Sequence, residues 1–296
     1  MKSLMPATRG HLAMLIFSAL VAGSFSLGGM IANEIAPAAL NALRFLLAGL
    51  IMGALVLATG GIPRAALRAP WRYLVLGGLF SAYFVLMFEG LKTAPPVSAA
   101  AVFTLTPIVT AGFGWLLLRQ ITTPRMALAL SIGAAGALWV IFRAELAALL
   151  AFKIGRGEAI YFIGCVFHAA FTPMLKLLNR GERSLVYSFL FMVAGFVLLT
   201  LWGWGDLMAT DWASLPALVW VTLFYLAIFA SAGSFFMLQY AARVLPSAKV
   251  MAYTYLTPAW VLCWEIALGH GVPPLLVLVG IALTAVALWL LLKDEG

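Results

Sequence analysis

The chain has 296 residues, of which 65% are hydrophobic and only 9% are charged. A soluble domain carries about 25% charged residues, so this chain has too few polar groups to cover a water-exposed surface. The net charge of +8 is scattered over short loops rather than gathered in one patch. The composition therefore excludes a soluble enzyme and a nucleic-acid-binding domain, and it predicts a protein whose solvent is the lipid bilayer.

Ten apolar segments are predicted to cross the membrane, because each is about 20 residues long and is bounded by charged residues or by Pro and Gly. Long runs without alternation favour helices over the short strands of a barrel. The predicted fold class is an all-α membrane protein with no separate extramembrane domain. The predicted spans are 11–30, 37–58, 72–92, 97–117, 125–143, 157–177, 184–204, 216–240, 247–266 and 274–292.

The basic residues predict how these spans are oriented. Most of the 18 Lys and Arg residues fall on segments that share one side of the membrane if both termini are cytoplasmic. Lys and Arg are enriched in cytoplasmic loops, so we expect both termini in the cytoplasm. The two largest clusters are Arg64, Arg68 and Arg72, and Lys176, Arg180 and Arg183.

The sequence contains an internal repeat. Residues 92–107 (KTAPPVSAAAVFTLTP) align without a gap with residues 243–258 (RVLPSAKVMAYTYLTP). Each half would hold five spans, and an odd number means that the second half is inverted relative to the first. Equivalent loops of the two halves carry opposite charge character, as inversion requires. We therefore predict two inverted five-helix repeats, at 1–146 and 147–296, an arrangement typical of alternating-access carriers.

Several short motifs follow one another in a recognisable order. Arg44-Phe-Leu-Leu-Ala-Gly49 precedes Gly90-Leu-Lys-Thr-Ala-Pro-Pro-Val-Ser-Ala-Ala-Ala, and a Thr-Pro pair follows. In this order the motifs resemble the EamA branch of the drug/metabolite transporter superfamily, over essentially the whole chain. Within that branch the chain is similar to the bacterial YddG-type exporters of aromatic and other amino acids.

This resemblance implies a transporter rather than an enzyme. It also implies a multi-pass protein of the bacterial inner membrane, which acts as a monomer surrounded by lipid and uses no cofactor, metal or nucleic acid. One feature departs from the family. The Gly-Glu pair that often ends the fourth helix of each repeat is replaced here by Leu118-Arg119 and Gly269-His270. Any role of that glutamate is therefore not carried over.

A stripe of polar residues follows one face of the predicted span 157–177. Steps of three and four residues place the side chains on one side of a helix. His168 lies near the middle of the span, where an ionisable residue is a candidate functional group. The alternative is a neutral histidine bonded to a neighbouring carbonyl or hydroxyl. The stripe consists of Glu158, Tyr161, Cys165, His168, Thr172 and Lys176.

We predict a substrate cavity near the middle of the membrane. Hydroxyl and imidazole groups would bind the backbone of an amino acid, and aromatic rings would contact its side chain. Ser24 is included because Val21–Phe25 aligns with Phe167–Phe171 of the second half. The alternative is that the aromatic residues only pack between helices. The predicted substrate-binding residues are Ser24, Tyr83, His168, Tyr253 and Trp260.

Three further residues have two interpretations each. Pro107 and Pro258 are predicted mid-helix at equivalent positions, either as gating hinges or as static kinks whose free carbonyls bond local hydroxyls. Arg44 lies below the outer end of its span. Its side chain either extends to the membrane surface or pairs with Glu34.

The predicted function is export of small metabolites, most consistently amino acids including aromatic ones, by alternating access. The alternative is a multidrug exporter of lipophilic compounds. A carrier of lipophilic cations would need an acid near mid-membrane. Glu89, Glu158 and Glu265 all fall near the outer ends of their spans, which favours a zwitterionic or neutral substrate.

Overall fold

A computed structural model describes residues 6–142, 144–150, 154–271 and 274–292. Every regular element in these ranges is helical. Arg143, the last residue of the predicted span 125–143, lies outside the described residues. The first half contains α1 (Pro6–Ile31), α2 (Pro37–Ala58), η1 (Arg64–Arg68), α3 (Trp71–Leu91), α4 (Pro96–Phe103), α5 (Thr106–Leu118), α6 (Pro124–Ile141) and α7 (Leu146–Leu150).

The second half repeats this pattern with an additional interruption. It contains α8 (Arg156–Leu178), α9 (Ser184–Trp202), α10 (Trp204–Ala209), α11 (Ala217–Ala227), η2 (Ile228–Gly233), α12 (Ser234–Val244), α13 (Ser247–Ala252), η3 (Tyr253–Leu256), α14 (Thr257–Ala267) and α15 (Leu275–Leu292). The element η2 is a π-helix that joins α11 to α12 without a turn, and η3 is a 3₁₀ segment. The short helices α7 and α10 were not expected from the sequence.

Within the described ranges, eight helical segments are long and apolar enough to cross a membrane. Two of them combine shorter elements, namely Pro96–Leu118 and Ala217–Val244. A further apolar helix, Leu275–Leu291, is shorter. The remaining predicted span, 247–266, corresponds to α13, η3 and α14, which together form no single regular helix. The chain is thus an all-helical, multi-pass membrane protein, and the count of ten spans stays a prediction.

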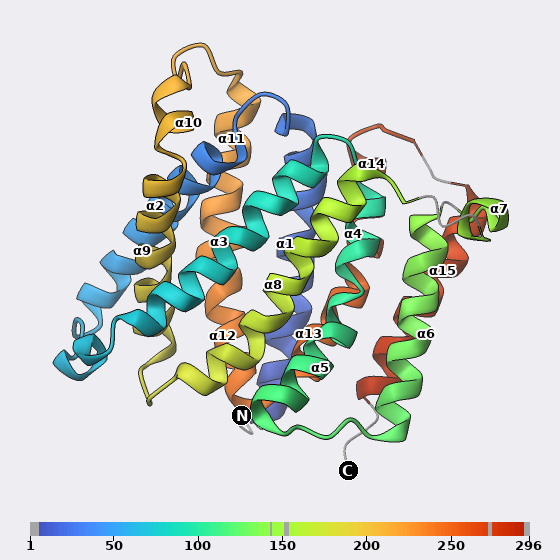
Figure 1. Ribbon diagram of the computed structural model, residues 1–296, viewed down its shortest axis with the longest axis horizontal. Coiled ribbons are helices and arrows are strands. Elements are labelled where there is room, and N and C mark those ends of the chain that lie inside the picture. The colour runs from blue at the N-terminus through green and yellow to red at the C-terminus, as the bar shows by residue number, and fades with distance from the viewer. Residues whose placement is uncertain (1–5, 143, 151–153, 272–273, 293–296) are drawn as a thin grey trace, which may run out of the picture.

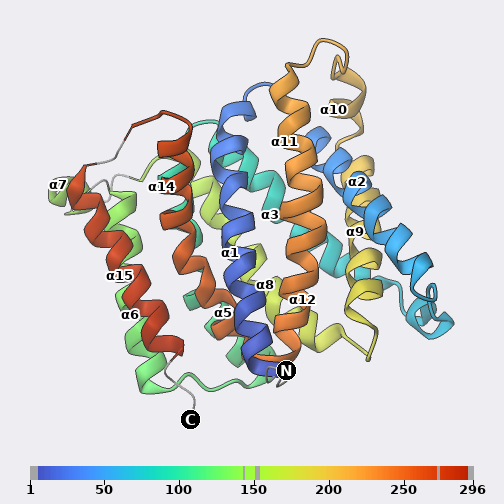
Figure 2. The same ribbon diagram turned by 180° about the vertical axis from the view of Figure 1, so that it is seen from behind.

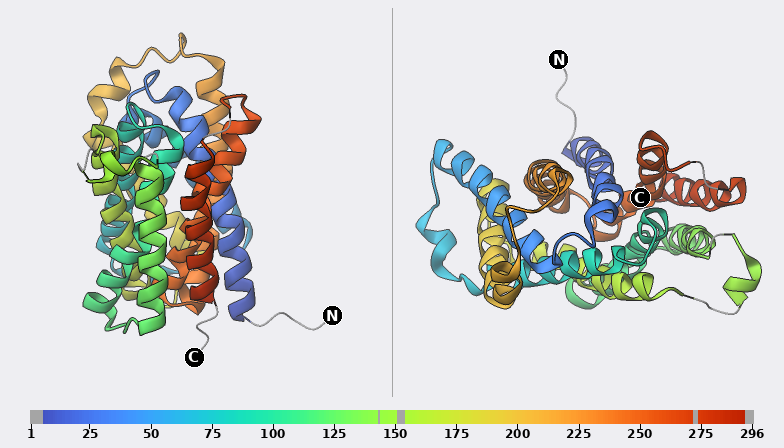
Figure 3. Two further views of the ribbon diagram at one scale, coloured as in Figure 1. Left: turned by 90° about the vertical axis from the view of Figure 1, so that its right-hand side faces the viewer. Right: turned by 90° about the horizontal axis from the view of Figure 1, so that it is seen from above.

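The helices form an elongated bundle in which distant parts of the sequence lie side by side (Figure 1). Helix α3 packs along α8, α2 along α9, α6 along α15, and α1 along α12. The view from above places α2 and α9 towards one side and α6 and α15 towards the other (Figure 3). The helices α1, α3, α8 and α12 enclose the middle of the bundle (Figure 2), so both halves of the sequence line its centre.

Pro107 and Pro258 were expected in the middle of helices, but neither interrupts a continuous α-helix. Each stands within the first turn of a new helix, α5 and α14 respectively. A proline is well accommodated there, because the N–H that it lacks has no partner in the first turn. Within the described ranges, Pro173 lies inside a helix, in α8. It leaves the carbonyl of Ala169 without its helical donor.

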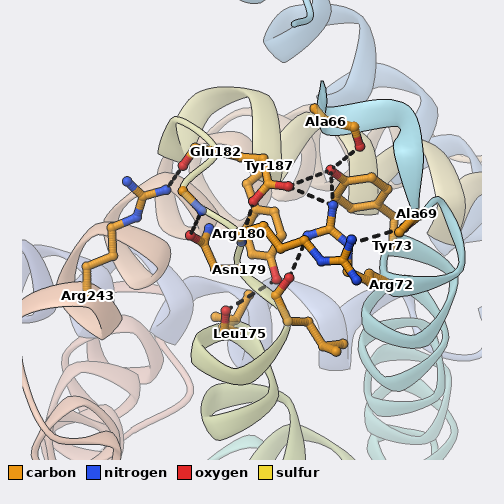
Figure 4. Close-up of polar contacts among 12 residues, drawn as sticks. Ala66, Ala69, Arg72, Tyr73, Leu175, Asn179, Arg180, Glu182, Tyr187 and Arg243 are labelled. Atoms are coloured by element: carbon orange, nitrogen blue, oxygen red, sulfur yellow. Dashed lines mark hydrogen bonds and ion pairs between the residues drawn. The ribbon is translucent and has the colours of Figure 1, made fainter. Parts of the chain in front are cut away.

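One end of the bundle, which we call the basic end, holds the start of α1, the end of α15, η1 and the α8–α9 turn (Figures 1 and 2). A polar network connects α3, α12 and that turn (Figure 4). The Arg72 guanidinium is paired with Glu182 at 2.7 Å, and their side chains are 1% and 7% exposed. It also donates to the carbonyl of Leu178 at 2.6 Å. Arg243 donates to the backbone carbonyl of Glu182.

The Glu182 carboxylate lies in the turn between α8 and α9. Burial alone would raise its pKa, but the hydrogen bond from Arg72 and one from the backbone N–H of Arg180 outweigh burial. The pKa of Glu182 is therefore lowered from its ordinary value. The charged pair joins the two halves of the sequence at the basic end.

Candidate functional site

Seven buried rings meet at the centre of the bundle, and we call them the central aromatic cluster. Phe80 occupies its middle, with ring centroids 4.1 Å from Phe171, 4.4 Å from Phe235 and 5.2 Å from His168. These rings come from α3, α8 and α12, and α4 adds one more. The cluster consists of Phe80, Tyr83, Phe84, Phe103, His168, Phe171 and Phe235.

Two of the predicted site residues, Tyr83 and His168, meet inside this cluster. Their ring centroids are 4.4 Å apart, and each residue is 1% exposed. The Tyr83 hydroxyl is 3.1 Å from the hydroxyl of Tyr161. Among the described residues Nδ1 of His168 has no hydrogen-bond partner, so the expected neighbouring carbonyl or hydroxyl is not found at that atom. Most of the α8 stripe is thus a buried polar face, and Glu158 and Tyr161 contact Ser98 and Tyr83 of the other half of the chain.

Tyr253 and Trp260 lie against α1 instead of against the cluster. The Tyr253 hydroxyl is 3.0 Å from Nδ1 of His11. The Trp260 indole N–H donates to the Ser18 hydroxyl at 3.2 Å, and Trp260 is 37% exposed. In this conformation the structure does not bring them together with Tyr83 and His168. Their role in substrate binding stays a prediction.

Ser24 lies on the same helix, further from its start. It is 1% exposed, and its hydroxyl has no partner among the described residues. The neighbouring Phe25 ring lies 5.8 Å from Phe103 and 5.8 Å from Tyr161. Ser24 is therefore adjacent in the chain to a residue whose ring contacts Phe103 of the cluster.

Two polar cavities lie at opposite ends of the bundle, with the cluster between them. A cavity of about 410 Å³ is lined by Ser26 of α1, Asn33 of the α1–α2 turn, the α3–α4 turn, Glu265 and His270. A second, of about 280 Å³, is lined at the basic end by Lys176, Asn179, Gln239 and Arg243.

The number of helical residues between the cluster and each cavity gives the distance that separates them. Leu91 of the first cavity follows Tyr83 by about 12 Å along α3, and Lys176 of the second follows His168 by about 12 Å along α8. The cluster thus separates two polar compartments.

Arg44 occupies a position that neither interpretation of the sequence anticipated. It is fully buried on α2, so it does not extend to the membrane surface, whereas Glu34 is exposed. Its guanidinium donates to the Ser231 hydroxyl at 2.5 Å and to the Ala230 carbonyl at 2.8 Å. Both earlier alternatives are wrong, because the π-helix η2 provides acceptors inside the bundle.

Sequence reasoning also missed Phe80 and Phe235, which lie at the centre of the cluster. Phenylalanine is common in any membrane span, so a single Phe in an apolar run carries no signal of position. Arg44 did carry a signal, since charged residues inside a span are rare and functional by default.

The chain is similar to known transporters over most of its length. The model of the EamA-like transporter family matches it twice, at residues 8–142 and 155–293. The chain is 25% identical over 262 residues to the uncharacterized transporter YyaM of Bacillus subtilis (strain 168), covering 88% of this chain and 86% of YyaM. A crystal structure of a protein 20% identical in sequence superposes with a TM-score of 0.74, covering 97% of this chain and 96% of the other. The chain belongs to the EamA-like transporter family, and it is a membrane transporter of small molecules.

Proposed function

We propose that this transporter consists of two inverted five-span repeats, 1–146 and 147–296, and crosses the membrane ten times. Three features support this arrangement. Helices α1 and α8 begin at opposite ends of the bundle (Figure 1). The interrupted segments α4–α5 and α13–α14 break just before matching prolines and pack against each other. The two family matches leave α7 between them, at the proposed boundary.

The proposed location is a bacterial inner membrane, with both termini cytoplasmic and the protein acting as a monomer. The clustering of arginine and lysine at the basic end supports the orientation, because cytoplasmic segments carry an excess of these residues. Arg68, Arg180 and Arg183 all lie on η1 or on the α8–α9 turn.

The proposed function is alternating-access export of small metabolites, in particular amino acids including aromatic ones, as in the YddG-type exporters that the sequence resembles. The observation that carries this proposal is the central aromatic cluster, closed between two polar cavities. Rings stack favourably with an apolar or aromatic side chain. In the conformation described, Tyr83 and His168 are packed and buried between the cavities. Substrate passage therefore requires the two halves to move relative to each other.

A multidrug exporter of lipophilic compounds is the second candidate. A cationic drug would be stabilised by an acid inside the bundle. Three carboxylates near the ends of the helices already have partners, Glu89 with Lys92 at 2.7 Å, Glu158 with Ser98 at 2.8 Å and Glu265 with His270 at 2.9 Å. These contacts favour amino acids over lipophilic cations.

Uptake of radiolabelled substrates into proteoliposomes tests the proposal. The panel contains phenylalanine, leucine, alanine and the lipophilic cation tetraphenylphosphonium, each with and without a proton gradient. We expect phenylalanine to enter faster than in protein-free vesicles and to be accelerated by unlabelled phenylalanine inside. Transport of tetraphenylphosphonium with no transport of any amino acid would favour the second candidate.

Two substitutions on α8 provide a matched pair for the same assay. Phe171 packs against Phe80 in the cluster, whereas Phe167 lines a groove on the surface of the bundle and is 36% exposed. We expect Phe171→Leu to weaken phenylalanine transport several-fold relative to alanine transport, and Phe167→Leu to change neither.

A further inference from the structure

Arg44 is a fully buried cation within a membrane-spanning helix. It is seven residues beyond Pro37, the first residue of α2, or about 10 Å along the helix axis. A charged side chain at such a depth is costly and is retained where it pairs with another group or binds a substrate. The contacts of Arg44 therefore indicate what it does.

Both hydrogen-bond acceptors of Arg44 are neutral. Nε donates to Ser231 and Nη2 to the carbonyl of Ala230, while Nη1 has no partner among the described residues. Within the same part of the chain, no carboxylate lies at ion-pair distance from this guanidinium. Arg44 thus has a spare donor and an uncompensated positive charge.

The acceptors of Arg44 lie in an unusual element. Ala230 and Ser231 both belong to η2, and π-helical turns occur frequently at functional sites. The Ala230 carbonyl also accepts a bond from the Ser234 hydroxyl at 2.8 Å. The Ala230 carbonyl would therefore still accept the hydrogen bond from Ser234 if the Arg44 guanidinium moved to bind another group.

A continuous series of contacts joins Arg44 to the central aromatic cluster. Its guanidinium carbon lies 3.7 Å from the centroid of the Phe84 ring. That ring is 4.7 Å from Tyr83 and 5.0 Å from Phe80. A molecule whose ring replaced or stacked on these aromatic groups would have its polar end within reach of the guanidinium.

We propose that Arg44 is the anion-binding residue of the transport site and that it binds the carboxylate of the substrate. This inference rests on the proposed function and specifies its substrate class as apolar or aromatic carboxylates, for which an α-amino group is dispensable. A guanidinium binds a carboxylate through two parallel charge-assisted hydrogen bonds. An anion supplies the charge compensation that Ser231 and Ala230 do not provide.

Thermal unfolding of the purified protein with two phenylalanine derivatives tests this inference. Hydrocinnamate keeps the ring and carboxylate without the amine, and phenethylamine keeps the ring and amine without the carboxylate. We expect hydrocinnamate to stabilise the wild-type protein and phenethylamine not to do so. Arg44→Gln should weaken hydrocinnamate binding by about tenfold or more, a change of about 1.4 kcal/mol or more, and Arg44→Lys should restore part of it. The control Arg68→Gln removes the same charge from the exposed η1 and should bind as the wild type does.

A second variant tests the site in the opposite direction. Ser231→Ala removes one of the neutral acceptors that compete for Arg44, so hydrocinnamate should bind this variant a few-fold more tightly. Equal stabilisation by the two compounds, hydrocinnamate binding to Arg44→Gln within about twofold of wild type, or weaker binding to Ser231→Ala would each overturn the proposal.

The same variants separate this proposal from the proposed function. Arg44-dependent hydrocinnamate binding without phenylalanine transport in proteoliposomes would support the carboxylate site and refute amino-acid export. Phenylalanine transport that is unchanged in Arg44→Gln would support export and refute the role of Arg44.

Discussion

Arg44 and Arg72 are both buried arginines, and they differ in the groups that surround the guanidinium. Arg72 is paired with the Glu182 carboxylate and also donates to two backbone carbonyls, those of Leu178 and Ala69. Within the part of the chain that the structure describes, the hydrogen-bond acceptors of Arg44 are the neutral Ser231 hydroxyl and Ala230 carbonyl. Breaking a buried ion pair is strongly destabilising, whereas a charged residue within a membrane span that lacks a counter-ion is a candidate binding group. The partners of a buried charge, rather than its burial, distinguish these two roles.

The two arginines also occupy different regions. Arg72 lies at the basic end, where its network ties the start of α3 to the α8–α9 turn (Figure 4). Arg44 lies beside the central aromatic cluster. Helix α8 reaches both regions, because it provides His168 to the cluster and the Leu178 carbonyl to Arg72. Pro173 lies between these two residues.

The largest expected effect is at Arg72. Arg72→Gln leaves the Glu182 carboxylate buried without its counter-ion, which costs about 3–5 kcal/mol of folding free energy. We expect a large fall in the thermal unfolding midpoint of the detergent-purified protein. The double variant Arg72→Gln with Glu182→Gln should recover part of the loss, because it leaves no charge unpaired. Equal destabilisation by the single and double variants would show that the ion pair is not responsible.

The next largest effect is the loss of folding stability at low pH. The pKa of Glu182 is lowered in the folded protein, so its stabilising contribution is complete above the ordinary carboxyl pKa of about 4.3 and is lost as the pH falls through the lower folded value. Wild-type stability should therefore decrease below about pH 4.3. Unfolding midpoints of wild type and Glu182→Gln, measured from pH 7 to pH 3, should converge in acid. A difference that stays constant over this range would contradict the assignment.

Arg44 should respond in the opposite way to Arg72 in the absence of ligand. Arg44→Gln removes a charge that has no counter-ion, and Ala230 keeps its bond from Ser234. We expect the free energy of unfolding to stay within about 1 kcal/mol of the wild-type value, or to rise. A loss as large as that of Arg72→Gln would mean that both arginines are structural.

The smallest effect on stability is expected at Pro107, and Pro173 serves as its comparison. Pro173→Ala restores a helical bond to Ala169 within α8, so it should raise the unfolding midpoint and slow transport. Pro107→Ala at the start of α5 restores no such bond and should leave stability nearly unchanged. Turnover of these variants in proteoliposomes distinguishes a hinge at Pro173 from hinges at Pro107 and Pro258. If Pro107→Ala and Pro258→Ala slow transport more than Pro173→Ala does, the hinges lie at Pro107 and Pro258, the two residues that the sequence pattern offered as gating hinges.

Much of the architecture was predictable from the sequence. Composition and run length predicted an all-helical membrane protein, and the order of motifs from Arg44 to the Thr-Pro pair identified the family that the comparisons confirmed. Steps of three and four residues predicted the buried polar face of α8, and Tyr83 and His168 do meet. These features depend on local patterns, which a sequence displays directly.

The features that were not predicted depend on contacts between distant segments. The partners of Arg44 are 186 and 187 residues away in the chain, and the π-helix that presents them has no recognisable sequence pattern. Pro107 and Pro173 illustrate a second limit. A proline inside an apolar run is compatible with either a helix interior or the first turn of a new helix, and packing against the other half decides which is formed.

A structure of the protein with bound 4-bromohydrocinnamate tests the central claim most directly, because anomalous scattering from bromine locates the ring independently of the rest of the ligand. We predict that the bromine lies among Phe80, Phe84 and His168, with the carboxylate hydrogen-bonded to the guanidinium of Arg44. We also predict that at least one bond from Arg44 to Ser231 or Ala230 is lost. A ligand bound elsewhere, with its carboxylate paired to Lys92 or Lys176 and the contacts of Arg44 unchanged, would contradict the account.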